Sequence, residues 1–169
     1  SLVFDKTSPQ TYSTAINASC SCTNPELSAK LYRNDIDITT TENNLLVILG
    51  AGTWNYICNV SASQNYTSAS KSSSFVVNQA TPSLTLSSNT SWTGTYPVAT
   101  NVSGAGCPSQ LTCNFYRDSV SRSNPDIESL GAGTYVYVYN TTGNANYSSA
   151  TATNILVVSK NSDSCNVLF

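Results

Sequence analysis

The chain has 169 residues and a net charge of −2 at neutral pH, and only 9% of its residues are charged. An average soluble domain has roughly 25% charged residues, so the surface polarity here comes mainly from 28 serines, 21 threonines and 19 asparagines. This composition argues against the basic surface that nucleic acids require. The longest purely aliphatic run, Leu45–Leu49, is far shorter than the roughly 20 residues that span a bilayer. We expect no nucleic-acid partner and no membrane span.

One stretch occurs in two copies, residues 49–70 and residues 130–151, at a constant offset of 81. Each copy begins with Gly-Ala-Gly, which suits a tight turn because glycine accepts positive φ. It continues as an aromatic-rich strand and a polar turn with Asn-Tyr-[Thr/Ser]. Upstream, Asn17 aligns with Asn101 at an offset of 84, and the starts match as Ser1-Leu-Val-Phe against Ser83-Leu-Thr-Leu.

The repeat predicts two small domains, residues 1–80 and 81–163, joined at Gln79–Pro82 and followed by a tail at 164–169. Short β-branched and aromatic runs between Gly, Pro, Asn and Ser predict strands throughout and favour a sandwich. The expected strands are 2–6, 12–20, 29–33, 36–39, 45–49, 53–60 and 73–79, then 83–88, 96–103, 111–117, 126–130, 134–140 and 152–159.

Alternation along the strands predicts which side chains point inward. Because successive side chains of a strand face opposite sides, Cys20 and Cys58 fall on faces opposite to Asn17 and Asn59. This predicts buried cysteines and outward asparagines. In strand 134–140, tyrosines alternate with valines, so that strand is either buried on both faces or carries exposed tyrosines.

Two motifs resemble a known family. Tyr56-Ile-Cys58 is similar to the Tyr-x-Cys of immunoglobulin domains, whose cysteine bridges to an early strand. The Gly-Ala-Gly-Thr-[Trp/Tyr]-x-Tyr signature and its Asn-Tyr-[Thr/Ser]-Ser-Ala hairpin resemble the Ig-like repeats of bacterial and archaeal cell-surface and extracellular filament proteins. The resemblance covers the chain twice and implies an all-β fold of two tandem immunoglobulin-like β-sandwich domains. Tyr139 stands where the first domain has Cys58, so a core disulfide, from Cys20 or Cys22 to Cys58, is implied only there.

Six cysteines and no histidine indicate disulfides rather than zinc, and hence an oxidising, extracellular or cell-surface location. Cys107 and Cys113 bracket a small loop that a local bridge would close. One of Cys20 and Cys22 is then left over together with Cys165, and a bridge between successive molecules is a natural outcome.

Asn-x-[Ser/Thr] sequons predict surface glycosylation. Their number is close to chance for this composition, but three pairs occupy matching positions in the two copies of the repeat. The seven sequons begin at Asn17, Asn59, Asn65, Asn89, Asn101, Asn140 and Asn146.

The tail is expected to take part in self-assembly. At the offset of 81, Ser164 corresponds to Ser83, which begins the first expected strand of the second domain, so the tail resembles an opening strand. We expect it to dock head to tail on the first domain of a neighbouring copy, giving a homopolymer. The alternatives are a boundary cut through a longer array and a tail that folds back. The tail residues are Ser164, Cys165, Asn166, Val167, Leu168 and Phe169.

The sequence offers little for catalysis. Histidine, the usual general base and metal ligand, does not occur. The close carboxylate pairs Asp35-Ile-Asp37 and Asp126-Ile-Glu128 are interpreted as solvated turns rather than calcium sites. Three lysines, Lys6, Lys30 and Lys71, are interpreted as exposed rather than as isopeptide-forming. We expect no catalytic residue, no metal and no cofactor.

The preferred interpretation is therefore a non-enzymatic extracellular structural protein, a glycosylated tandem Ig-like subunit of a surface filament or a stalk. The alternative is an adhesin or carbohydrate-binding module that recognises surface glycans by aromatic stacking. The candidate rings for that alternative are Tyr12, Tyr66, Trp92, Tyr96 and Tyr147.

Overall fold

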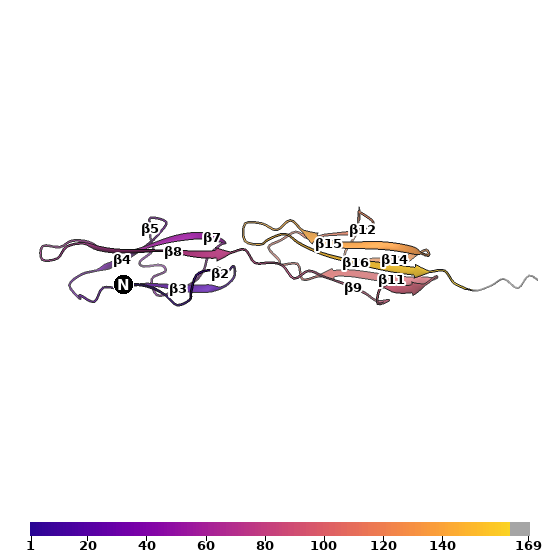
Figure 1. Cartoon of the computed structure of the whole chain (residues 1–169), viewed down its shortest axis with the longest axis horizontal. Helices are drawn as coiled ribbons and strands as arrows, with labels where there is room; N and C mark the ends of the chain where they lie inside the picture. Colours follow the sequence, from indigo (N-terminus) through magenta and orange to yellow (C-terminus); the bar gives the residue numbers. More distant parts are fainter. Residues whose placement is uncertain (163–169) are drawn as a thin grey trace, which may run out of the picture. The chain divides into compact units, whose positions relative to one another are not determined.

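The computed structural model describes residues 1–162, and every regular element in that range is a β-strand. Within those residues there is no helix that could cross a membrane. Contacts divide the chain into two compact units, Ser1–Ala80 with Ala145–Tyr147, and Thr81–Asn144 with the described residues from Ser148 onward. The strands of each unit form two layers (Figure 1).

The first sandwich packs a three-stranded sheet, in the order β1-β3-β6, against a five-stranded sheet, in the order β2-β8-β7-β4-β5. Neighbouring strands run antiparallel except β2 and β8, which are parallel. The strands are β1 (Leu2–Phe4), β2 (Gln10–Thr11), β3 (Ala15–Cys20), β4 (Ala29–Arg33), β5 (Ile36–Asp37), β6 (Leu46–Ile48), β7 (Gly52–Val60) and β8 (Ala69–Asn78).

The second sandwich repeats this order strand for strand, with sheets β9-β11-β14 and β10-β16-β15-β12-β13. Here β10 and β16 are the parallel pair. The strands are β9 (Thr85–Ser88), β10 (Thr93–Thr95), β11 (Val98–Ala105), β12 (Asn114–Arg117), β13 (Val120–Ser121), β14 (Asp126–Leu130), β15 (Gly133–Thr141) and β16 (Ala150–Ser159). The chain is thus all-β, with two tandem immunoglobulin-like β-sandwiches.

Side-chain alternation follows the prediction in the strands that carry the core cysteines. Cys20 and Cys58 are buried, whereas Asn17 and Asn59 are partly exposed on the opposite faces. The ambiguity in β15 is resolved in favour of inward tyrosines: Tyr137 and Tyr139 are buried, and the intervening valines face outward. The repeat therefore places its apolar faces inward with a period of two.

Strand register corrects the alignment of the two starts. Leu2 pairs with Cys20, and Leu86 pairs with Gly104, which is the residue equivalent to Cys20 at the offset of 84. Leu2 is therefore equivalent to Leu86 and not to Leu84. The expected match of Ser1-Leu-Val-Phe with Ser83-Leu-Thr-Leu was wrong by two residues, because a shift of two keeps the inward parity and leaves the pattern unchanged.

Candidate functional site

The most deeply buried ion pair of the described residues lies in the core of the second sandwich. Arg117 of β12 donates from Nη1 to Oδ2 of Asp126 in β14 at 2.7 Å, and the Tyr137 hydroxyl donates to the same oxygen at 3.0 Å. All three side chains are buried. Burial and the hydrogen bond to Asp126 raise the pKa of Tyr137 to about 12, although Arg117 opposes the shift. The cluster ties the two sheets together.

Asp126 was therefore wrongly interpreted as part of a solvated turn. Its sequence spacing from Glu128 resembles an exposed acidic pair, but Asp126 begins a strand and faces the core, opposite Val102. In the first sandwich, Asp37 is exposed, and its carboxylate accepts a hydrogen bond from the Thr39 backbone N–H at 3.0 Å.

The first sandwich has a similar cluster around Arg33, which is equivalent to Arg117 at the offset of 84. Arg33 forms an ion pair with Glu42, and its guanidinium lies 5.1 Å from the centre of the Trp54 ring. The hydroxyl of the neighbouring Tyr56 is buried without a hydrogen-bond partner among the described residues. Burial raises the pKa of Tyr56, an effect that Arg33 opposes. The Arg33 and Glu42 charges therefore have a structural role in the first sandwich.

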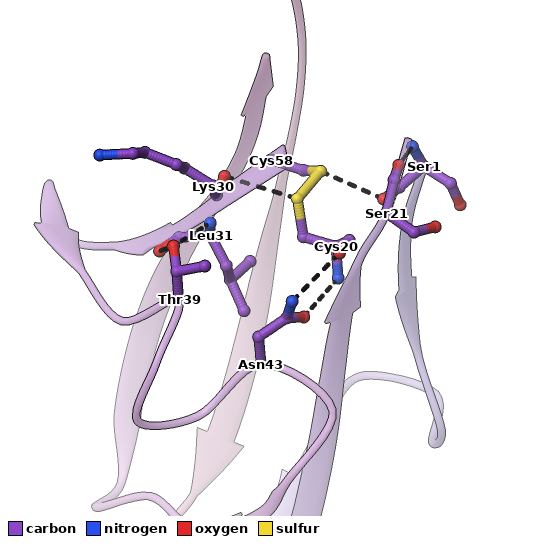
Figure 2. Close-up of a disulfide and its surroundings, with 8 residues drawn as sticks. All are labelled: Ser1, Cys20, Ser21, Lys30, Leu31, Thr39, Asn43 and Cys58. Carbon is purple, nitrogen blue, oxygen red and sulfur yellow. Dashed lines mark hydrogen bonds between the residues drawn. A yellow bond between two sulfur atoms is a disulfide. The ribbon is translucent and has the colours of Figure 1, made fainter. Parts of the chain in front are cut away.

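A disulfide joins Cys20 of β3 to Cys58 of β7 and so links the two sheets of the first sandwich (Figure 2). Its Cα atoms are 5.4 Å apart. Asn43 secures the β3 end of the bridge, because its Oδ1 accepts from the Cys20 backbone N–H at 2.8 Å and its Nδ2 donates to the Cys20 carbonyl at 3.2 Å. A side-chain amide thus takes the place of a neighbouring strand at this edge.

The second sandwich has a different arrangement. Cys107 and Cys113 are bridged within the loop between β11 and β12. The positions equivalent to Cys20 and Cys58 are Gly104 and Tyr139. The Tyr139 ring occupies the space that a side chain at Gly104 would need.

Cys22 is the free cysteine of the described residues. It is half-buried and lines a cavity of about 200 Å³, together with Cys58 and Lys71 among others. Strand alternation could not decide between Cys20 and Cys22, because residues two apart in a strand face the same side. The structure ends β3 at Cys20, so Cys22 lies beyond the strand. Cys165 and the rest of the predicted assembly segment, Ser164–Phe169, lie outside the described residues.

The predicted sequons occupy several kinds of position. Asn17 and Asn101 are central on the outer faces of the three-stranded sheets, and Asn59 and Asn140 lie on β7 and β15. Of the others, Asn65 is exposed in the β7–β8 loop, Asn89 is exposed after β9, and Asn146 is half-buried in the loop before β16.

The candidates for other chemistry are dispersed. The described residues contain no group of three or more His, Cys, Asp or Glu side chains that could hold a metal ion. Lys30 and Lys71 are exposed, and Lys6 pairs with its neighbour Asp5. Trp92 packs on the core beside Tyr137, so it is not a free platform for a sugar. Tyr12 and Tyr147 are half-buried, whereas Tyr66 and Tyr96 are 40% and 49% exposed.

Two repeated β-sandwiches of this strand order define a tandem immunoglobulin-like module. No protein-family model and no curated protein matches the chain. Two solved structures are similar over nearly the whole chain. One is described as Clostridium thermocellum CbhA fibronectin(III)-like modules, with 12% identity, coverage of 95% of both chains and a TM-score of 0.32. The other is a chimeric titin Z1Z2-Z1Z2 tandem, with 14% identity, coverage of 94% of this chain and 99% of that chain, and a TM-score of 0.31.

Proposed function

We propose that the chain is a non-enzymatic, extracellular structural module, a tandem segment of a surface stalk or filament. The observation that carries this proposal is the repeated core, in which the best-placed charges form structural ion pairs. Arg33 of β4 pairs with Glu42 in the turn before β6, and Arg117 pairs with Asp126 between the two sheets. Two disulfides further support it, since structural bridges persist in oxidising compartments. Together these features suit a module that resists unfolding and separates other parts of an assembly.

Location is the first test. Antibodies against the folded protein, applied to intact cells of the producing organism, are expected to label the surface in electron micrographs. Brief protease treatment of intact cells should remove the label. A protein recovered from the cytoplasm, with all cysteines reduced, would contradict the proposal.

The finer proposal is end-to-end assembly of copies through residues 164–169. Because Cys20 is bridged to Cys58, the thiol on the first sandwich that remains to receive Cys165 of another copy is Cys22, which lines an open cavity. The experiment compares Cys165→Ser and a truncation after Lys160 with the unaltered chain. Both are expected to remove oligomer ladders from non-reducing gels and filaments from micrographs.

A matched variant makes the assembly test specific. Cys22→Ser should abolish the covalent ladder while the Cys20–Cys58 bridge remains intact. An unchanged ladder in Cys22→Ser would show that the bridge uses another residue. Unchanged filaments after truncation would overturn assembly through the tail and leave a stalk segment as the function.

The exposed rings of Tyr66 and Tyr96 support a second candidate, an adhesin or carbohydrate-binding module. Exposed aromatic faces can stack on sugars. A glycan array probed with the wild type and with a Tyr66→Ala, Tyr96→Ala double variant tests this. Binding that the double variant loses would favour the adhesin, whereas an array without signal would count against it.

A further inference from the structure

An exposed aliphatic side chain lies directly across from a sequon asparagine in both sandwiches. Asn17 of β3 pairs with Leu46 of β6, and Asn101 of β11 pairs with Ile127 of β14. Leu46 and Ile127 are each 65% exposed on the outer face of their three-stranded sheets. Cβ atoms of directly opposed residues lie about 4.5–5.5 Å apart. Each asparagine is thus adjacent to an uncovered apolar side chain.

The local hydrogen bonds leave the amide of Asn101 available. Asn101 is exposed, and its side chain makes no hydrogen bond within the described residues. The Asn17 side chain makes one long contact, from its Nδ2 to Oδ1 of Asn44 at 3.4 Å. Both sequon serines follow two residues later, so in an extended strand they lie on the same face as the asparagine.

Asn89 provides the contrasting case. Its Oδ1 accepts from the Asn101 backbone N–H at 2.8 Å, and its Nδ2 donates to the Ala99 carbonyl at 3.1 Å. Asp5 makes the equivalent contact in the first sandwich, accepting from the Asn17 backbone N–H at 2.7 Å. Asp5 cannot be glycosylated, yet it makes the same contact. We therefore interpret the Asn89 side chain as structural: it holds β11 through hydrogen bonds, and its sequon is a coincidence of sequence.

We propose that Asn17 and Asn101 carry N-linked glycans whose first sugars cover Leu46 and Ile127, and that Asn89 is unmodified. The glycan donor is a lipid-diphosphate-linked oligosaccharide. A bond forms between asparagine Nδ2 and C1 of the first sugar, the C1–O bond to the diphosphate breaks, and the lipid diphosphate leaves while Nδ2 gives up one proton. This inference rests on the proposed extracellular function, because such donors act on exported proteins.

The apolar face of a pyranose ring suits this position. Isolated exposed aliphatics are ordinary on protein surfaces, but here each one lies beside an attachment site, and the pairing occurs in both sandwiches despite their different residues. A covalently attached sugar needs no association of separate molecules, so it can cover the side chain at little entropic cost. The glycans would therefore shield the outer faces from unintended contacts.

Site-resolved mass spectrometry of the protein isolated from its own cells tests the proposal. Peptides that contain Asn17 and Asn101 are expected to carry oligosaccharide mass, and the Asn89 peptide is expected to carry none. The variant Asn89→Asp, which keeps the clamping oxygen, should have an unchanged glycan mass, whereas Asn17→Gln with Asn101→Gln should lose two glycans. A bare Asn101, or a glycan on Asn89, would overturn the assignment.

Shielding has a separate readout. The double glutamine variant is expected to bind more of a fluorescent dye that reports exposed apolar surface. Adding Leu46→Ser and Ile127→Ser should reverse the increase, whereas Val120→Ser, at an exposed position on the opposite sheet, should not. Surface labelling of the same cells separates the two proposals. A protein on the surface with an unmodified Asn101 would overturn only the glycan assignment, whereas a cytoplasmic protein would overturn both that assignment and the proposed extracellular function.

Discussion

The Tyr139 ring lies against the backbone of Gly104, so closely that a Cβ atom at Gly104 would be 2.6 Å from the ring Cγ. In the first sandwich the equivalent residues, Cys58 and Cys20, form the disulfide between the sheets. Equivalent positions in the two sandwiches therefore connect the sheets in different ways: a disulfide does so in the first, and an aromatic ring packed on a glycine does so in the second.

Gly104→Ala is expected to destabilise the second sandwich by about 1–3 kcal/mol, the usual range for overpacking a core. The added methyl group has no room unless the Tyr139 ring or the strand shifts. Urea unfolding monitored through Trp92 fluorescence measures the effect. Gly131→Ala is the control, because a Cβ there would approach nothing closer than 3.9 Å, and equal losses in both variants would refute this account.

Replacing both Cys20 and Cys58 by alanine should destabilise the first sandwich by on the order of 4 kcal/mol, because the bridge spans a sequence separation of 38. For Cys107 and Cys113, with a separation of only 6, the same chain-entropy reasoning gives about 2 kcal/mol. Trp54 reports unfolding of the first sandwich and Trp92 that of the second. A larger loss from the short bridge would contradict the loop-entropy explanation.

Arg117→Met is expected to destabilise the second sandwich by roughly 3–5 kcal/mol, since it leaves the Asp126 carboxylate buried without its cation. A second change, Asp126→Leu, should recover part of that loss in a double-mutant cycle. The control is Lys30→Ala, which removes an exposed ion pair with Asp37 and should leave the unfolding free energy almost unchanged, because solvent screens exposed charges. Additive losses in the cycle would show that the pair is not coupled.

Stability of the second sandwich should fall at alkaline pH. The pKa of Tyr137 rises from 10.0 to about 12 on folding, so its contribution is fully present below pH 10 and is lost as the pH rises through about 12. The expected loss is on the order of 2–3 kcal/mol. Unfolding free energies measured across this window provide the test, and Tyr137→Phe should show a flatter profile. An equally steep profile in that variant would assign the effect to other tyrosines.

Much of the architecture was predictable because it depends on local pattern. Repetition at offsets of 81 and 84 indicated two copies, and period-two alternation placed Cys20 and Cys58 inward. The short parallel strands β2 and β10 were missed, because two or three residues show no alternation and exist as strands only beside β8 and β16. Side-chain alternation predicts which face of a strand a residue occupies. It does not predict short strand pairings between segments that are distant in the sequence.

The candidate sites divide in the same way. The sequons and cysteines are visible as motifs, but the difference between Asn89 and Asn101 depends on hydrogen bonds across the sheet. Asp126 looked like an exposed acid until β14 placed it against Arg117. No local signal marks an acid whose partner is supplied by another strand.

The sequence by itself determined that the chain is an all-β, disulfide-bearing tandem, because strand period, turn residues and repetition are properties of neighbouring residues. Only the tertiary structure decided the partner of Cys58, the burial of the Arg117–Asp126 pair and the inward tyrosines of β15. Each of these depends on which strands lie opposite one another across the core. It also placed Tyr139 against Gly104, where the first sandwich has its disulfide.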